Sequence, residues 1–351
     1  MFKLYIFDEV NQDYIYQTNT ITDQLKNYKN QLEEYEKKLN SDQINPDLIR
    51  QELMLGNEID ANISYKALRN DIKVVYDSNK DMPGMKESKT SVRINTDNTG
   101  DLTGNVIEIT YSNLSKSTYK GRKISKIVAT YSDVIRDKQA PRNVQLRIMS
   151  NPFKGFWYWN TFEVKVDYKY YDENNNLINF DNDASSWITI GSLNAGNARQ
   201  EGASLLSAGK AYGFKDSSVT VHDGNTLYSD KANGFHTIIG GDWRDTTAID
   251  QSQYPWGTDY WDTGLDNRHA YYGAGIFKIS GSNLDITYRT TRANNLPKGY
   301  TDWGIWATIS TTIPKSNSGI VIPKISYHLD SELLCTLFYI LFIFKLYFLI
   351  L

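Results

Sequence analysis

The sequence predicts a mainly β protein: an antiparallel β-sandwich preceded by a helical segment. From Ile59 to about Ile313, apolar and polar residues alternate with a period of two, as in strands that bury one face. Turn sequences such as DNTGD, YKGRK and DENNN separate these segments, and no helical spacers intervene. The 351-residue chain has room for one sandwich of about 250 residues with extensions at both ends.

A helix is predicted over residues 20–55, ahead of the sandwich. Its apolar residues recur in steps of four and three, the seam of a coiled coil, at Ile21, Leu25, Tyr28, Leu32, Tyr35 and Leu39. Pro46 interrupts this pattern, and a second short helix is predicted from Pro46 to Leu55. We expect a stalk or a cover for one edge of the sandwich; a binding site for a partner helix is the alternative.

The predicted strands are dense before Ser192 and after Gly275. The section between these residues is rich in Gly, Asp, Asn, Trp and Tyr and poor in alternation, which favours ordered or functional loops. Within it, the stretch SVTVH ending at His222 predicts one short strand. The Asp-Gly-Asn sequence that begins at Asp223 predicts a hairpin turn directly after that strand.

Composition and motifs favour a binding protein over an enzyme. The net charge is −3, with 38 basic and 41 acidic residues, so no strong overall field attracts nucleic acid. The single cysteine, Cys335, excludes an intrachain disulfide and a cysteine-based zinc site. Metalloprotease, Gly-x-Ser-x-Gly and phosphate-loop motifs are absent, and no acid pair stands out by its spacing. The 25 tyrosines and 8 tryptophans are typical of sheet surfaces and of carbohydrate or interface platforms.

Two polar stretches in the middle of the chain are candidates for a ligand site. Ser192 and Asn194, in GSLNAG, are candidates to direct hydrogen-bonding groups at a ligand; the alternative is that Asn194 and Gly196 form a left-handed turn. Ser217, Ser218 and His222 form a hydroxyl cluster with one histidine, although a lone histidine is more often a structural residue.

An aromatic and acidic segment, residues 240–269, is the third candidate. Trp243, Trp256 and Trp261 lie among aspartates, as in carbohydrate platforms where a ring stacks on a sugar and carboxylates accept its hydroxyls. The aspartates are also candidates for Ca²⁺, which takes six to eight oxygen ligands, and we expect such ligands at Asp259, Asp262 and Asp266. Buried tryptophans with solvated acidic turns are the alternative.

A basic segment around Tyr119 is the candidate for nucleic acid. Its cations are Lys116, Lys120, Arg122, Lys123 and Lys126. As a strand, turn and strand it would contact phosphates without reading base sequence. A solvated hairpin whose lysines discourage edge-to-edge association is the alternative.

Several separated motifs, in order, resemble the glucan-binding protein C domain. They are LGNEIDANISY (55–65), ITYSNLSKSTYKGRKISKIVATYS (109–132), SSWITIGSLN (185–194) and GKAYGFKDSSVTVHDGNTLYSDKAN (209–233). The same domain forms the variable region of streptococcal antigen I/II adhesins and the adhesin domain of enterococcal aggregation substances. The resemblance covers roughly residues 55–315, and the helical segment resembles the end of the antigen I/II stalk.

The resemblance implies a lectin-like β-supersandwich on a Gram-positive cell surface that acts in adhesion and not in catalysis. It implies a polymeric polar ligand (a glucan or glycoprotein), with lipoteichoic acid or extracellular DNA as the alternative, often with bound Ca²⁺, and we expect a monomeric domain. The family's Ser-Leu-Asn turn falls on Ser192, Leu193 and Asn194. Its Ser-Ser-x-x-x-His stretch falls on Ser217, Ser218 and His222, followed by Asn225. In this reading four tryptophans supply stacking surface: Trp187, Trp243, Trp256 and Trp261.

Three domains are therefore expected: a helical segment over 1–54, the adhesin domain over 55–315, and a linker with an apolar tail over 316–351. Residues 333–351 approach the length of a membrane span but contain Lys345, so a membrane anchor and a truncated or out-of-frame tail are both open. No signal peptide or wall-sorting sequence is recognisable, and LPKGY at 296–300 does not match the latter. Cell-surface localisation is expected from the resemblance alone.

Overall fold

The computed structural model describes most of the predicted sandwich. The described residues are 49–79, 87–196, 198–233, 261–264, 266–292 and 304–314, with 43–44 and 46, the backbone of 237–239 and 242–244, and helical residues between 12 and 33. Glu36–Ile320 form one compact unit. This unit is built almost entirely from antiparallel strands, so the predicted mainly β fold class is confirmed.

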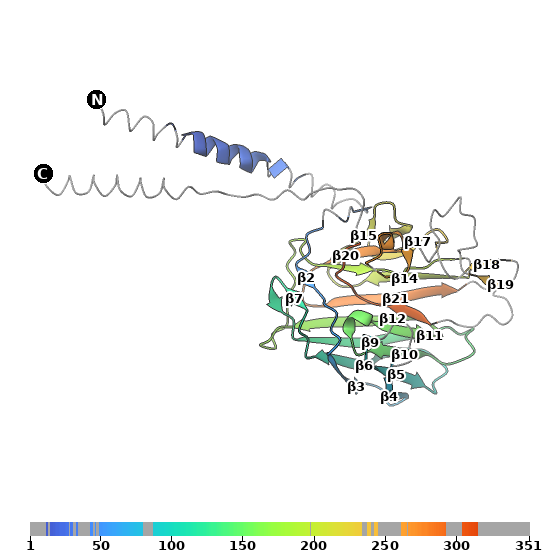
Figure 1. The fold of residues 1–351 in the computed structure, drawn as a ribbon. Helices are drawn as coiled ribbons and strands as arrows, with labels where there is room; N and C mark the ends of the chain where they lie inside the picture. The colour runs from blue at the N-terminus through green and yellow to red at the C-terminus, as the bar shows by residue number, and fades with distance from the viewer. Residues whose placement is uncertain are drawn as a thin grey trace, which may run out of the picture. The chain divides into compact units, whose positions relative to one another are not determined.

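One long sheet of eight strands runs through the unit (Figure 1). In spatial order the strands are β16 (Val219–His222), β17 (Thr226–Ser229), β14 (Arg199–Leu205), β21 (Leu284–Arg292), β12 (Thr161–Tyr171), β9 (Lys126–Arg136), β6 (Leu102–Ser112) and β3 (Asn62–Ala67). Alternation decides which face of each strand is buried. On β12, Val164, Val166, Tyr168 and Tyr170 point into the core, and the residues between them do not.

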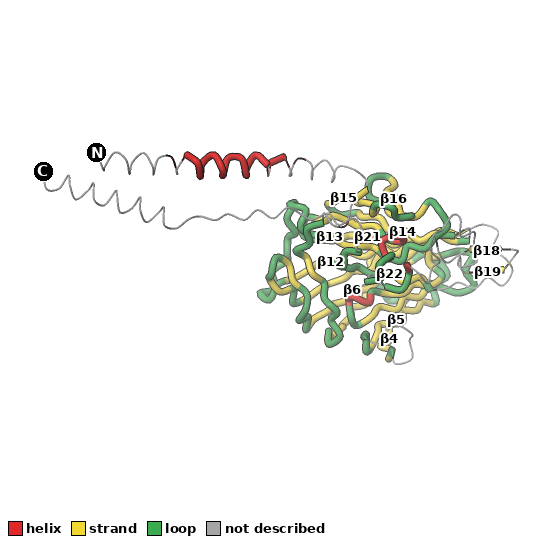
Figure 2. The backbone as a smooth tube through the Cα atoms, turned by 45° about the horizontal axis from the view of Figure 1, so that its top comes forward, coloured by secondary structure: helices red, strands yellow, loops and turns green. Residues whose placement is uncertain are grey.

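Two shorter sheets form the opposing layer, and Figure 2 shows the layers from a second direction. The five-stranded sheet is β22 (Ile305–Ala307), β11 (Phe156–Trp159), β10 (Gln145–Met149), β5 (Thr90–Thr96) and β4 (Ile72–Ser78). The four-stranded sheet is β1 (Gln43–Ile44), β15 (Gly209–Phe214), β20 (Gly275–Ile279) and β13 (Trp187–Ile190), in which β1 and β15 are parallel. Paired backbone hydrogen bonds between Thr189 and Ser310 connect the two sheets.

The core is apolar and rich in tyrosine. A single cluster of buried residues contains side chains from all three of these sheets. The ring of Phe156 on β11 meets Tyr131 edge-on at 5.1 Å and Tyr288 at 5.3 Å, which joins the five-stranded sheet to the long one. Burial raises the pKa of the Tyr131 and Tyr288 hydroxyls well above their usual value, so these groups stay neutral inside the protein.

Among its described residues, the expected loop-rich section after Ser192 contains six strands, which corrects the sequence-based interpretation. It contains β14, β15, β16 and β17, and the short pair β18 (Thr237–Ile239) and β19 (Asp242–Arg244). Alternation is weak in β14 and β15 because most of their residues are buried on both faces. The predicted hairpin is confirmed: β16 pairs with β17, and Asp223 (φ 51°) and Gly224 (φ 76°) form its turn.

The helical prediction is correct in one part and wrong in another. Residues 15–27 are helical, earlier than expected, and residues 34–42 lie outside the described residues. The second helix, Pro46–Leu55, is wrong because Leu53–Met54 form β2, which pairs with β7 (Thr118–Tyr119). β7 in turn forms a hairpin with β8 (Arg122–Lys123). The fully buried side chain of Leu53 and this pairing outweigh local helical preference. No helix within the described ranges is long and apolar enough to cross a bilayer.

Replacing Phe156 with alanine should lower the free energy of unfolding by about 3–5 kcal/mol, because a fully buried ring is removed from between the two layers. Urea denaturation of both proteins measures this loss. Leu177→Ala is the control: its side chain is 42% exposed, so its loss should be below about 1 kcal/mol. Equal losses in both variants would contradict the assigned packing.

Candidate functional site

The structure brings many of the expected ligand-binding residues together, but it uses their polar groups internally. Asn233, which is fully buried, is the centre of this cluster, called here the Asn233 network. Its side-chain amide donates to the Leu193 carbonyl oxygen at 3.0 Å and to Ser218 Oγ at 2.7 Å, and its Oδ1 accepts from the Ala195 amide at 2.7 Å. Its carbonyl oxygen accepts from Trp261 Nε1 at 2.9 Å.

The other polar groups of the two predicted stretches also have partners within the fold. Ser217 Oγ donates to the carbonyl oxygens of Tyr272 and Ala274 at 2.9 and 3.0 Å, next to the 3₁₀ helix η4 (Ala270–Gly273). Asn194 is 3% exposed, and its amide donates to Asp262 Oδ2 at 2.9 Å. The left-handed residue of this motif is Ser192, with a φ of 58°, and not Asn194 or Gly196, where the turn was expected. These residues therefore position loops rather than present free groups to a ligand.

Two of the four expected stacking tryptophans are buried. Trp187 is 0% exposed and Trp261 is 1% exposed, and the indole nitrogen of each donates to a backbone carbonyl. Neither offers a face to a sugar, so this expectation is corrected for both residues. Trp243 lies on β19, where only the backbone is described, and Trp256 lies outside the described residues.

The expected calcium ligands do not form a cage in the described part of the chain. Asp262 accepts the Asn194 amide, Asp266 is exposed, and Asp259 lies outside the described residues. No group of three or more acidic, histidine or cysteine side chains suited to a metal occurs among the described residues. Calcium binding stays a prediction.

The basic segment forms the β7–β8 hairpin, with β8 at Arg122–Lys123, and two of its five cations, Lys120 and Lys123, form ion pairs with acids from elsewhere in the chain. Lys120 Nζ lies 2.6 Å from a carboxylate oxygen of Asp181 and 2.6 Å from one of Asp183, with Glu52 at 3.9 Å. The hydrogen bond from Lys120 is the main reason that the pKa of Asp183 falls to about 2.

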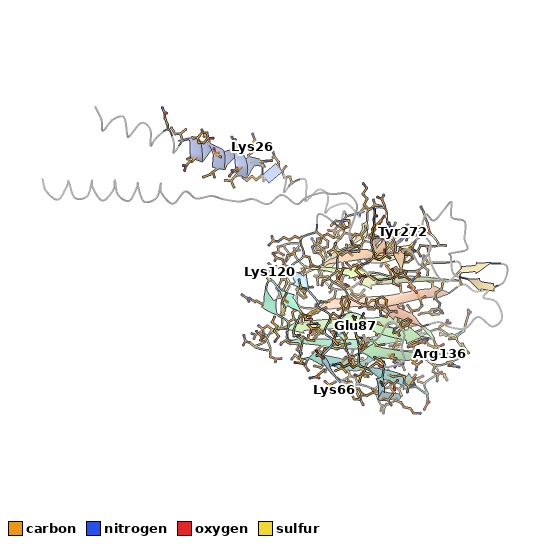
Figure 3. All side chains as sticks on the ribbon, in the orientation of Figure 1. Lys26, Lys66, Glu87, Lys120, Arg136 and Tyr272 are labelled. Atoms are coloured by element: carbon orange, nitrogen blue, oxygen red, sulfur yellow. The ribbon has the colours of Figure 1, made fainter. Side chains whose placement is uncertain are left out.

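The remaining cations of this segment are also engaged or lie near acids. Lys123 pairs with Glu173 at 3.3 Å. The pKa of Asp172 is lowered mainly by hydrogen bonds from Asn176 and to a smaller extent by the charge of Arg122. Lys126 lies 4.0 Å above the Tyr171 ring and donates to Asn175. Lys116 lies near Asp60, where it is a minor cause of a lowered pKa after Lys89. Figure 3 labels Lys120 on this hairpin well away from Tyr272.

A hollow lined by polar side chains lies on the outer face of the long sheet. It is called here the Tyr228 hollow, and it is lined by Gln200, Glu201, Gly202, Tyr228, Arg289 and Thr291, from β14, β17 and β21. Its volume of about 190 Å³ is below the ~300–1,000 Å³ of drug-sized ligand pockets, so it suits one small unit of a larger ligand.

Gly202 creates the space in this hollow. It lies in register between Tyr228 on β17 and Arg289 on β21. A Cβ at this position would come within 2.9 Å of the Leu227 carbonyl oxygen and 3.3 Å of Tyr228 Cβ, so a larger residue does not fit without displacement. The absent side chain leaves an opening between an aromatic ring and a guanidinium group.

His222 supports the Tyr228 ring from the opposite side. The two rings stack with centroids 3.5 Å apart and an angle of 5°. His222 Nε2 lies 2.9 Å from Thr220 Oγ1 and 3.4 Å from an Asp230 oxygen, which holds the imidazole in place. The Asn225 amide donates to the Leu205 carbonyl oxygen at 2.7 Å and stabilises the turn beside it. Of the predicted site residues, His222 contributes to the hollow by supporting the Tyr228 ring.

A tryptophan-rich surface on the five-stranded sheet was also missed. Trp157 and Trp159 alternate with buried Phe156 and Tyr158 on β11, so they point outward, and Trp157 pairs in register with Trp306 on β22. The Trp157 and Trp159 rings are 6.0 Å apart at an angle of 20°. All three tryptophans are partly buried, so this sheet face carries aromatic rings where polar side chains are usual. The signal was present in FWYW, where aromatic residues occupy both faces of one strand.

Sequence reasoning missed the hollow for a different reason. Its residues come from three strands separated by up to about 90 positions, and Gly202 and Arg289 carry no local motif. Only the pairing of β14 with both β17 and β21 places them side by side.

The fold is a β-supersandwich domain with a polar hollow on its exposed sheet face. The family model of glucan-binding protein C matches residues 36–310, and the chain belongs to this family.

Two solved proteins share the fold. Glucan-binding protein C of Streptococcus mutans, described as mediating sucrose-independent and sucrose-dependent adherence, is 20% identical, with a TM-score of 0.51 over 80% of this chain and 83% of that one. The adhesin domain of PrgB from Enterococcus faecalis, solved bound to DNA, is 15% identical, with a TM-score of 0.53 over 76% of this chain and 97% of that one. A second structure of the PrgB adhesin domain, for which no DNA is named, gives a TM-score of 0.52.

Replacing Asn233 with alanine should lower the free energy of unfolding by at least about 2 kcal/mol. The change leaves the Ala195 amide and the Leu193 carbonyl without their partner, and each buried unpaired group costs about 1–3 kcal/mol. Chemical denaturation measures the loss. The exposed Asn174→Ala is the control and should change stability by less than about 0.5 kcal/mol. A loss at Asn233 no larger than at Asn174 would show that the network does not form.

Replacing Lys120 with methionine should make the protein less stable near neutral pH, and the difference from the wild type should shrink in acid. The pKa of Asp183 is lowered from 3.8 to about 2, so its ionised form stabilises the fold above about pH 4, and this contribution is lost as the pH falls toward 2. Denaturation curves between pH 2 and pH 6 measure the difference. Lys73→Met is the control, because its pair with Asp97 is largely exposed and surface pairs contribute about 0–1 kcal/mol. A constant difference for Lys120→Met across this range would contradict the assignment.

Proposed function

We propose that this chain is a cell-surface adhesin domain of a Gram-positive bacterium that binds a polymeric polar ligand, a glucan or a glycoconjugate, in adhesion or aggregation. Membership of the glucan-binding protein C family supports the adhesive role. The names and descriptions of the two structural neighbours, an adherence protein and an adhesin domain, agree with it. The observation that carries the proposal is the Tyr228 hollow, because it combines an aromatic ring with polar side chains on the outer face of the long sheet.

The chemistry of the hollow suits a sugar unit. A ring such as that of Tyr228 packs against the C–H face of a pyranose, and its hydroxyl remains at the rim for hydrogen bonding. Gln200 and Thr291 add an amide and a hydroxyl group at the same opening. Because His222 stacks on the other side of the Tyr228 ring, the ring is already held in position and loses little conformational freedom on binding.

A single hollow of this size makes a weak site, so affinity for a polymer would come from repetition. A polymer presents the same unit many times, and many adhesin copies on one cell bind it together, which raises the effective affinity without new contacts. The outward surface of Trp157, Trp159 and Trp306 offers a second place for aromatic stacking in the same domain. Calcium binding near Asp262 and Asp266 is part of this proposal, and it is tested by measuring ligand binding with and without the ion.

Binding of extracellular DNA and lipoteichoic acid through basic residues is the second candidate function, since the PrgB adhesin domain was solved bound to DNA. Phosphate binding depends on cations that release counterions when they meet the polyanion. On the β7–β8 hairpin, Lys120 and Lys123 already pair with carboxylates. This neutralisation favours the polar-polymer proposal over DNA binding at this hairpin.

Binding of the full chain to dextran and to duplex DNA should be measured at low and high salt, with and without calcium. We expect dextran binding that changes little with salt, because stacking and neutral hydrogen bonds release no counterions. Tyr228→Ala should weaken it about 5- to 20-fold, corresponding to about 1–2 kcal/mol. Tyr171→Ala, on another part of the long sheet, is the matched control and should have little effect. DNA binding that collapses with salt, with no dextran retained, would support the second candidate instead.

A further inference from the structure

We propose that the Tyr228 hollow takes an oxyanion of the polymer, a carboxylate or a phosphate on one of its units, through the guanidinium group of Arg289. This inference rests on the proposed function and adds the charge of the ligand unit to it. It concerns a site on the outer face of the long sheet, separate from the Asn233 network and from the β7–β8 hairpin.

Arg289 differs from its neighbours on this face because its charge is not neutralised. On the adjacent strand, Lys165 pairs with Asp285 at 3.3 Å and Lys169 pairs with Asp167 at 3.5 Å. Within the described part of the chain, no carboxylate lies at ion-pair distance from the Arg289 guanidinium, although Glu163 is its register neighbour on β12. A partly buried cation without a counterion favours an external anion.

The surroundings orient this guanidinium as an anion receptor. Its central carbon lies 5.8 Å from the centroid of the Tyr228 ring, a cation–π distance. The planar N–H groups of arginine then form a fork that matches two oxygens of a carboxylate or phosphate. The Thr291 and Tyr228 hydroxyls and the second amide hydrogen of Gln200, whose first bonds to the Ser229 carbonyl at 2.7 Å, are further donors.

The one acidic residue in the lining does not oppose an anion. Glu201 alternates with Gln200 and Gly202 along β14, so its side chain points to the other side of the strand. There it is 7% exposed, and its Oε2 accepts the Asn194 backbone amide at 3.1 Å. The hollow itself therefore presents donors and one positive charge, next to a strand position, Gly202, that carries no side chain.

Three oligosaccharide-length probes test this inference on the full chain: an oligogalacturonate, an oligo(glycerol phosphate) and a neutral dextran oligomer. We expect the wild type to bind one of the anionic probes at least tenfold more tightly than the neutral one. The preferred probe identifies the oxyanion as carboxylate or phosphate. Arg289→Gln should lose at least tenfold for that probe and leave dextran binding within about twofold. Arg289→Lys should retain part of the preference, because charge remains while the fork is lost.

Lys165→Gln is the matched control, because it removes a positive charge from the same face, where that charge is already paired. It should change binding of all probes less than about twofold, and circular dichroism should show every variant folded. Equal binding of anionic and neutral probes by the wild type, or an unchanged preference in Arg289→Gln, would overturn the inference while dextran binding still supports the proposed function. Binding of none of the three probes would overturn both.

Discussion

The apolar inner face of the eight-stranded sheet has to be covered along its whole width, and the rest of the domain depends on this constraint. Eight strands at the usual spacing make a face about 34 Å wide. One five-stranded sheet is too narrow, so the four-stranded sheet covers the remainder, and the Thr189–Ser310 bridge joins the two. Phe156 packs on Tyr131 and Tyr288 at one part of this interface. At another, the lack of a side chain on Gly275 lets Leu227 approach β20 closely.

Covering the inner face leaves the outer face of the long sheet as the surface on which a site can form. The strands there are held by both neighbours, so Tyr228, Gly202 and Arg289 sit at register positions that the core determines. The loops at the end of the sandwich are held differently, by buried amides such as that of Asn233. An amide that satisfies buried backbone groups is not available to a ligand, which is why the conspicuous polar loop residues are structural here.

How far the sequence predicts this structure depends on the range of the interactions involved. Alternation of apolar residues identified β6, β9 and β12 correctly, because one buried face is a local property of a strand. The helix assigned to Pro46–Leu55 failed because the burial of Leu53 against β7 depends on a partner more than sixty residues away. The tryptophans were misassigned for the same reason: composition cannot tell that Trp187 faces the core while Trp157 faces outward.

The pairing of charged residues shows most clearly that the sequence does not predict contacts between distant segments. In the sequence, the lysines around Tyr119 form the most basic segment, and Arg289 is an isolated arginine in a strand. Folding gives the lysines around Tyr119 and Arg289 different partners, and these partners affect how each can bind an anion. Asp181 and Asp183, about sixty residues further along the chain, pair with Lys120, and Glu173 pairs with Lys123, so two cations of the cluster are neutralised. Near Arg289, Asp285 and Asp167 pair with Lys165 and Lys169, and among the described residues no carboxylate lies at ion-pair distance from the Arg289 guanidinium. Whether a cation can bind an anion therefore depends on the partners that the fold gives it, and clustering in the sequence does not determine those partners.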